Sequence, residues 1–363
     1  MMRKEYIDKL AVLMKNDGLD AVLVCPSEEL TFLIGFSPKM CARFQGLFVK
    51  SDGTMFYLCN LIYTTEMESK ISGIPIHSWF DGDVMVECVH EILKNEGLIG
   101  KKIGVNRTAQ AFNILDIAEK SGITFSNAKP LLEDIRIIKT DEELENMRIS
   151  ASIADKAFSA VLQFVKPGMR EGEVKKFLFA EMAKHGGTDH SAIVARGPNS
   201  SFPHYSSEDG IIEENDVILF DIGCAYKNMR TDMSRMVFMG EPTEEMIKIY
   251  EICRKSTEAG EAVAFENAYI PDIDKASRDV IEASGYSKFF INRLGHGIGY
   301  VGHEAPDIKA SNKRRLERGM CFTIEPGINL PGKFGMRVED VVAITSKGTE
   351  ILSKTTHDMI VLK

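Results

Sequence analysis

Residues 217–223 read Val-Ile-Leu-Phe-Asp-Ile-Gly, so a carboxylate follows directly on four apolar residues. The apolar run predicts a buried strand. An ionised carboxylate in such a strand is costly unless a cation, hydrogen-bond donors or a raised pKa compensates it. The same pattern recurs at residues 320–327 (Met-Cys-Phe-Thr-Ile-Glu-Pro-Gly) and 337–344 (Arg-Val-Glu-Asp-Val-Val-Ala-Ile). All three stretches therefore predict strands whose carboxylates need a compensating partner.

The order of predicted elements is repeated within the second part of the chain. Thr140 and Thr243 each begin a long helix, which is followed by a proline-containing break and a second helix, over about 172–185 and 273–284. A histidine segment and two β-rich segments with a carboxylate on each then complete both halves. The matched polar residues are His204, Asp221 and Asp232 in the first half and His303, Glu325 and Glu339 in the second. This repeat predicts a duplicated helix-helix-strand-strand domain.

One more histidine, His296, lies between glycines in the sequence Gly-His-Gly-Ile-Gly at 295–299. Its glycine neighbours leave the imidazole unobstructed. Four carboxylates and one imidazole suit two divalent ions held close together, and manganese, cobalt, iron and zinc fit this set better than magnesium. Asp232 alone is also typical of a turn, and Glu339 with Arg337 of a surface pair. The matched placement of all five residues favours the metal site.

The first part of the chain predicts a separate α/β domain. Helices are expected over residues 3–16 and 84–95, and strands at 21–24, 46–49, 55–58 and 102–105, with a hairpin turn at Asp52-Gly53. Residues 126–138 have weak periodicity and contain a proline, so the domain boundary is expected there.

Six motifs resemble the creatinase/prolidase/methionine aminopeptidase family, the M24 or pita-bread metallopeptidases. They are FDIG (220–223), TDMSR (231–235), GHGIG (295–299), HEAP (303–306), TIEPG (323–327) and RVED (337–340). LIGF at residues 33–36 resembles the amino-terminal domain of the Xaa-Pro peptidase branch. The resemblance implies a two-domain α/β protein, with a creatinase-like domain over 1–130 and a pita-bread catalytic domain over 131–363.

The resemblance also implies that the chain binds two divalent metal ions, with Mn²⁺ expected ahead of Co²⁺, Zn²⁺ or Fe²⁺. The implied ligands are Asp221, Asp232, His296, Glu325 and Glu339. Asp232 and Glu339 would bridge the ions, and a hydroxide between the ions would attack the scissile amide.

The resemblance gives the neighbouring residues supporting roles. Glu325 would handle the proton of the attacking water, and His204 and His303 would bind the substrate carbonyl and its oxyanion. Arg337 and Thr323 would lie just outside the ligands and support them.

The expected activity is removal of the first residue from peptides with proline in second position, as in an Xaa-Pro aminopeptidase. Asp307 lies where many dipeptide-specific relatives carry an arginine, and an aspartate repels the free carboxylate of a dipeptide. An Xaa-Pro dipeptidase (prolidase) that uses another basic residue stays open, as does a hydrolase of small non-peptide amides. A non-catalytic peptide- or RNA-binding protein, using the basic residues 313–315, is disfavoured because every ligand is present.

Composition limits the remaining partners. The chain has 44 Lys and Arg against 53 Asp and Glu, a net charge of −9, so no nucleic-acid partner is expected. No apolar run reaches the roughly 20 residues needed to span a bilayer, so no membrane association is expected. The seven scattered cysteines predict reduced thiols and a cytoplasmic location. Peptide substrates and a homodimer are expected from the family resemblance.

Overall fold

The computed structural model describes residues 2–363. The chain divides into two compact units, residues 1–136 and 137–363, and each unit has its own hydrophobic core. The boundary expected at residue 130 lies within α6 (Lys129–Asp134), a short helix with Pro130 in its first turn, where proline is tolerated.

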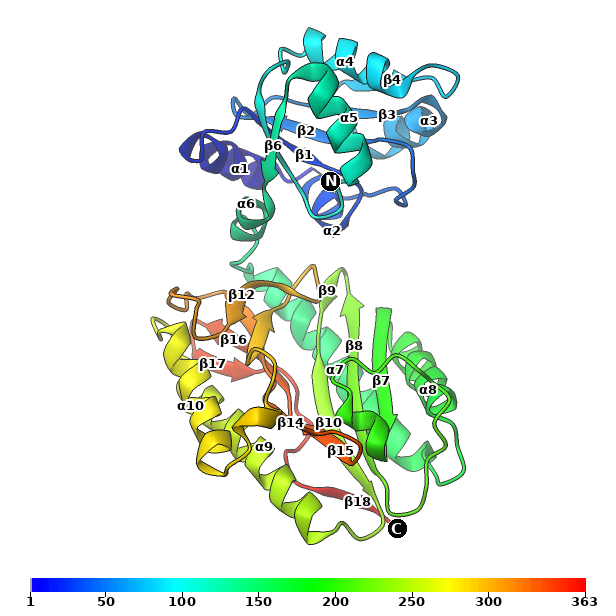
Figure 1. The fold of residues 1–363 in the computed structure, drawn as a ribbon, viewed down its shortest axis with the longest axis vertical. Helices are drawn as coiled ribbons and strands as arrows, with labels where there is room; N and C mark the ends of the chain where they lie inside the picture. Colours follow the sequence, from blue (N-terminus) through cyan, green and yellow to red (C-terminus); the bar gives the residue numbers. More distant parts are fainter. Residues whose placement is uncertain (1) are drawn as a thin grey trace. The chain divides into compact units, whose positions relative to one another are not determined.

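The first unit is built on a six-stranded mixed sheet in the order β4-β3-β2-β1-β5-β6 (Figure 1). Its strands are β1 (Ala21–Val24), β2 (Gly46–Lys50), β3 (Met55–Asn60), β4 (Ile76–Trp79), β5 (Lys102–Val105) and β6 (Thr124–Asn127). Its remaining helices are α1 (Lys4–Asn16), α2 (Glu28–Ile34), α3 (Leu61–Lys70), α4 (Met85–Asn95) and α5 (Ala111–Ser121). The predicted strands and the two predicted helices are confirmed, and β2 and β3 form the expected antiparallel hairpin.

Four helices of this unit, α2, α3, α5 and α6, were not predicted. α3 shows why, because only Met67 of its ten residues is buried, which leaves almost no apolar periodicity to detect. This helix begins instead at a cap, where the Asn60 side chain accepts a hydrogen bond from the Ile62 N–H.

The second unit contains the predicted repeat. The first half comprises α7 (Asp141–Phe164), α8 (Glu171–Lys184), β7 (Thr188–Arg196), η1 (Gly197–Ser201), β8 (Val217–Tyr226), β9 (Met229–Arg230) and β10 (Met233–Met239). The second comprises α9 (Glu244–Ala262), α10 (Ile270–Ala283), η2 (Ser287–Phe289), β11 (Gly295–Gly297), β12 (Glu304–Ile308), β13 (Cys321–Ile324), β14 (Gly327–Leu330), β15 (Phe334–Arg337), β16 (Asp340–Thr345), β17 (Gly348–Ile351) and β18 (Ile360–Leu362).

The strands of this unit form two main sheets. Their orders are β18-β10-β8-β7 and β12-β11-β13-β16-β17, and β14 and β15 form a separate hairpin (Figure 1). Helix α7 packs on the first sheet, where Phe158 contacts Phe220 of β8 edge to face at 5.7 Å. Every residue of β8 from Val217 to Ala225 is buried except Asp221, which is partly exposed. Asp221, which interrupts the apolar run in the sequence, is therefore also the position at which the buried strand becomes partly exposed.

An isolated bridge joins the two main sheets at Ser234 and Glu339. The Glu339 N–H donates to the Ser234 carbonyl at 3.1 Å. This contact connects the start of β10 with the residue before β16, so it brings together carboxylates from the two halves.

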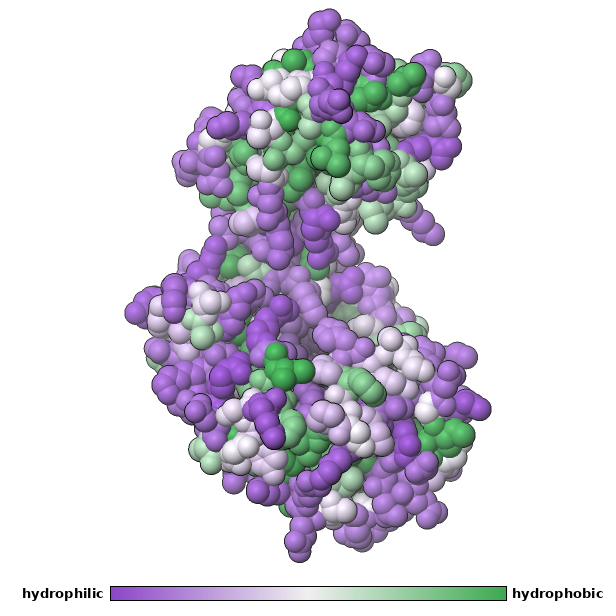
Figure 2. All heavy atoms as spheres, viewed as in Figure 1, coloured by the Kyte–Doolittle hydropathy of each residue, from purple (hydrophilic) through white to green (hydrophobic). Residues whose placement is uncertain are grey.

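The exposed face of the protein is mainly polar (Figure 2), as expected when each unit buries its apolar residues in a core. Figure 2 shows a mainly hydrophilic face on both units, with the larger apolar areas on the first unit. Among the helices of residues 2–363, none combines the length and the apolar character that crossing a membrane requires.

The predicted capping box at the start of α7 is present and can be tested. The Thr140 hydroxyl accepts from the Glu143 N–H at 3.2 Å, and Glu143 accepts from the Thr140 N–H at 2.9 Å. We expect Thr140→Ala to lower the free energy of unfolding by about 0.5–2 kcal/mol because one helix N–H loses its acceptor. Urea titration measures this, with Thr140→Ser as the control that keeps the hydroxyl. An unchanged midpoint for Thr140→Ala would contradict the assignment.

Candidate metal centre

One pocket, of about 270 Å³, collects nearly all the side chains that the sequence singled out. The predicted residues that line it are His204, Asp221, Asp232, His296, His303, Glu325, Arg337 and Glu339. Thr323 is fully buried and lies just behind it, since its hydroxyl bonds to Glu325. The two halves of the second unit therefore contribute to a single site.

A larger groove of about 920 Å³ lies elsewhere on this unit, beside α7 and β17. Two of its acidic residues, Glu145 and Glu350, already pair with Arg148 at 3.0 and 2.8 Å. The smaller pocket, with its concentration of carboxylates, is therefore the better candidate for chemistry.

The strands explain why these carboxylates meet. Asp221 lies opposite Ser234 in the antiparallel register of β8 and β10, and Asp232 immediately precedes β10. Glu325 directly follows β13, and Glu339 directly precedes β16, its antiparallel partner. The four carboxylates thus lie within or at the ends of paired strands, where backbone hydrogen bonds fix their positions.

Residues 2–363 contain four groups of possible ligands whose donor atoms lie within 4.8 Å of one another, and three of these groups line this pocket. The groups are Asp221, Asp232 and Glu339; His296, Glu325 and Glu339; and Asp232, His296 and His303. The first two contain all five predicted ligands and share Glu339. This is the arrangement expected when one carboxylate serves two neighbouring ions.

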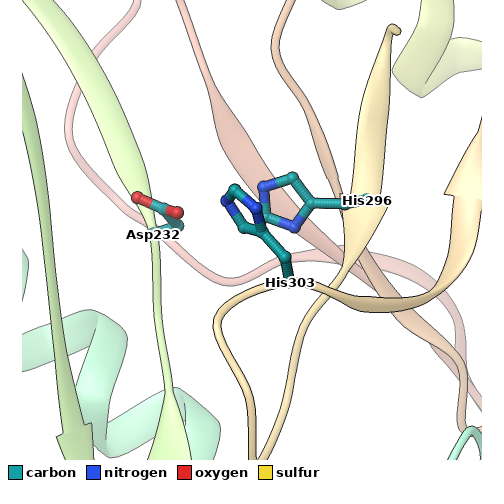
Figure 3. A group of neighbouring side chains, drawn as sticks. All are labelled: Asp232, His296 and His303. Atoms are coloured by element: carbon teal, nitrogen blue, oxygen red, sulfur yellow. The ribbon is translucent and has the colours of Figure 1, made fainter. Parts of the chain in front are cut away.

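The third group contains a histidine that was expected outside the ligands. The His303 ring lies 3.9 Å from the His296 ring, centroid to centroid, and both imidazoles face Asp232 (Figure 3). His303 therefore comes closer to the carboxylates than the sequence suggested. His204 is exposed and lies on the wall of the same pocket.

The carboxylates place excess negative charge in a buried space. Burial, followed by repulsion from Asp221 and Glu325, raises the pKa of Asp232 well above its usual value. Burial and the repulsion of the neighbouring carboxylates also raise the pKa of Glu339. Arg337 supplies one compensating positive charge for four carboxylates. The donor set and this charge imbalance fit divalent cations, which would favour the ionised form of both groups.

Hydrogen bonds hold the site carboxylates from behind. Arg337 donates from Nη2 to Asp221 at 2.5 Å and from Nε to the Ser234 hydroxyl at 2.8 Å. The Ser234 hydroxyl donates to Glu339 at 2.6 Å. Ser234 was not predicted as a site residue, although a hydroxyl two residues after Asp232 is a signal that could have identified it.

Thr323 connects two other predicted ligands. Its hydroxyl accepts from the His296 N–H at 3.1 Å and donates to Glu325 at 3.2 Å. Burial acts to raise the pKa of Glu325, but His296, Arg337 and the Thr323 hydroxyl together lower it. Glu325 is therefore ionised at neutral pH.

His303 is an uncharged histidine at neutral pH. Burial, and then the nearby His296 and Arg293, lower its pKa to about 4. Its imidazole is neutral at pH 7 and keeps one N–H to donate.

Arg293 is a further basic residue of the pocket that the sequence did not single out. Its Nη1 lies 3.4 Å from the Asp307 carboxylate, and its Nε is buried without a hydrogen-bond partner. Lys309 also pairs with Asp307, at 2.6 Å. The negative charge of Asp307 is thus compensated by two basic side chains, and one of them, Arg293, lines the pocket.

Comparisons with known proteins identify the family of the chain. Residues 145–346 match the model of metallopeptidase family M24, and residues 7–138 match the creatinase/prolidase N-terminal domain. The Xaa-Pro dipeptidase of Pyrococcus furiosus is 31% identical over 360 residues, covering 98% of this chain and 100% of that protein.

Solved structures show the same fold. A prolidase from Thermococcus sibiricus has a TM-score of 0.93 at 31% identity, with 100% of both chains covered. An X-Pro aminopeptidase from Thermotoga maritima has a TM-score of 0.84 at 27% identity, also with 100% of both chains covered. The expected creatinase-like domain and pita-bread domain are confirmed.

The raised pKa values of Asp232 and Glu339 predict how metal binding depends on pH. A carboxyl whose folded pKa exceeds its unfolded pKa contributes stability at low pH, and this stability is lost as the pH rises through the folded pKa. Metal ions relieve the repulsion at high pH, whereas protons compete with them at low pH. We therefore expect Mn²⁺ to raise the Tm of metal-free protein more at about pH 7.5 than at about pH 5.

Thermal unfolding with and without Mn²⁺ measures this difference. The double variant Asp232→Asn/Glu339→Gln is the control, because it lacks both titrating groups and should show little effect of metal at either pH. Equal shifts in the wild-type protein at both pH values would contradict the assignment.

Proposed function

Because the chain belongs to metallopeptidase family M24, we propose that it is a two-metal hydrolase of Xaa-Pro dipeptides. The observation that carries this proposal is the convergence of four carboxylates and one histidine on one pocket. Relatives named as Xaa-Pro dipeptidases and prolidases support the dipeptidase alternative over the Xaa-Pro aminopeptidase that the sequence placed first.

Asp221, Asp232, His296, Glu325 and Glu339 would hold the two divalent ions. When bound, the ions would polarise the scissile carbonyl and lower the pKa of a water molecule. The chain's own side chains would perform the proton transfers and bind the substrate.

Glu325 is suited to accept and return a proton. Its pKa is lowered, so it is ionised at neutral pH, and the Thr323 hydroxyl fixes the orientation of its carboxylate. The neutral His303 would donate its N–H to the oxygen that becomes negative as the amide is attacked. His204, on the pocket wall, would bind the substrate carbonyl from another side.

Arg293 gives the site a means of recognising a dipeptide. The sequence suggested that Asp307 repels the free carboxylate of such a substrate. Asp307 is instead compensated by Lys309 and by Arg293, which also lines the pocket. A substrate carboxylate would bind the terminal N–H groups of Arg293, whose side chain is 35% exposed, in a bond that a guanidinium can make bidentate.

The pocket also has an apolar part. Ile193 and Pro203 line it and would contact the ring of the substrate's proline or the side chain that precedes it. Because a peptide bond to proline lacks an N–H, such a site needs no acceptor at that position. The preference for proline is supported by the relatives' names together with this small apolar surface.

Three further proposals rest on the sequence alone. They are that Mn²⁺ is the native metal, that the protein forms a homodimer and that it is located in the cytoplasm. A hydrolase of small amides is the alternative that substrate assays separate from a peptidase.

Metal removal tests the core of the proposal. We expect verified metal-free protein to lose hydrolysis of Xaa-Pro dipeptides and to regain it when reconstituted with Mn²⁺, because the five ligands then recover their cations. Activity with Co²⁺, Zn²⁺ and Fe²⁺, each added alone, ranks the metals. Full turnover by the metal-free protein would refute the two-metal assignment, and failure on every Xaa-Pro substrate would favour the small-amide alternative.

Arg293 tests the choice between dipeptidase and aminopeptidase. We expect Arg293→Ala to raise KM for an Xaa-Pro dipeptide by about 10- to 150-fold, because a hydrogen bond to a charged group contributes about 1.5–3 kcal/mol. The same dipeptide with an amidated carboxyl end is the control, for which the variant should change little. Wild-type protein that prefers tripeptides, with Arg293→Ala affecting all substrates alike, would indicate an aminopeptidase instead.

A further inference from the structure

A buried ion pair lies next to the site and connects residues 165 positions apart in the sequence. Lys139 Nζ lies 2.6 Å from Glu304 Oε1, and each side chain is 1% exposed. Burying two charges carries a desolvation penalty that their attraction often only balances, so such a pair is weak evidence for stability. The more specific effect of the ion pair is on the backbone segments that it holds in place.

Glu304 connects Lys139 with the loop of residues 299–304. It directly follows His303 and begins β12, and its second oxygen accepts from the Val301 N–H at 3.3 Å. The backbone of Lys139 is itself fixed, because its N–H donates to the Gly319 carbonyl at 2.8 Å. One carboxylate thus connects the loop to Lys139, whose backbone is hydrogen-bonded within the second unit.

The other end of the loop is held independently. The Arg230 N–H donates to the Gly299 carbonyl at 2.9 Å, and Arg230 Nε donates to the Tyr300 carbonyl at 3.4 Å. Gly299 also leaves room for the ion pair, since a Cβ there would lie 2.5 Å from Lys139 Cε and 2.7 Å from Glu304 Oε1. Close packing against the ion pair therefore explains why the last residue of the GHGIG motif is glycine.

The loop backbone sets the position of His303. This side chain reaches over His296 toward Asp232 (Figure 3), so a shift of the loop would move its ring directly. We propose that the Lys139–Glu304 ion pair positions His303 against the scissile carbonyl, an inference that rests on the proposed hydrolase function. Lys139 and Glu304 are positioning residues, because neither lines the pocket.

The test uses the double variant Lys139→Met/Glu304→Gln in the metal-loaded, full-length protein. Each single variant leaves one buried charge unpaired and is prone to misfold, whereas the double variant removes both charges. We expect kcat on an Xaa-Pro dipeptide to fall about 10- to 100-fold, with KM and metal content nearly unchanged. Lys275→Met, which removes an exposed ion pair with Asp279, is the matched control and should leave kcat unchanged.

A double-mutant cycle separates positioning from a general structural effect. In a His303→Ala background, the Lys139/Glu304 changes should cause no further loss of kcat, because the group that they position is absent. Independent losses that multiply would overturn the proposal.

Hydrogen exchange provides a readout that does not depend on activity. We expect amide exchange across residues 299–304 to be faster in the double variant than in the wild type, and unchanged exchange would overturn the proposal. Wild-type protein that cleaves no Xaa-Pro peptide would refute the proposed function instead, and the exchange experiment would still decide whether the pair anchors the loop.

Discussion

Repulsion among the carboxylates of one pocket is the constraint on which the catalytic unit depends. Two like charges about 4 Å apart repel by about 4 kcal/mol at the effective dielectric typical of protein surfaces. Asp221, Asp232, Glu325 and Glu339 are held near one another nevertheless, because strand pairing and a few donors fix them. Arg337 and Ser234 supply part of the compensation, and the remainder is what makes the pocket suited to divalent cations.

The same constraint explains why much of the site could be predicted. A carboxylate in an apolar run is rarely accidental, so the strands around Asp221, Glu325 and Glu339 stand out from the sequence alone. Asp221 lies in β8 and Asp232 directly precedes β10, and these two strands are antiparallel partners. The duplicated order of helices and strands could be recognised because each half needs its own capped helix, as Thr140 and Thr243 show.

What could not be predicted depends on contacts between side chains distant in the sequence. The charge on Asp307 suggested repulsion of a carboxylate, but Arg293 Nη1 lies 3.4 Å from that group, in a contact across the irregular pairing of β11 and β12. The closeness of His303 to Asp232 likewise follows from the loop of residues 299–304 and leaves no mark on local periodicity. Helices with little buried surface, such as α3, escaped detection for the simpler reason that they lack an apolar face.

The pairing of β18 with β10 has a consequence for the synthesis of the chain. The three residues Ile360–Leu362 align in parallel with Val237–Met239, and the Gly240 N–H donates to the Leu362 carbonyl at 2.7 Å. While the ribosome is still translating the second half, β10 has an open edge on this side, of the kind that recruits other strands. The first unit has no such dependence and can fold as it emerges, whereas the catalytic unit closes this edge only after residue 362 has been added. Nascent chains of this protein therefore carry an exposed edge while residues 240–362 are being added, which gives chaperones a defined segment to protect.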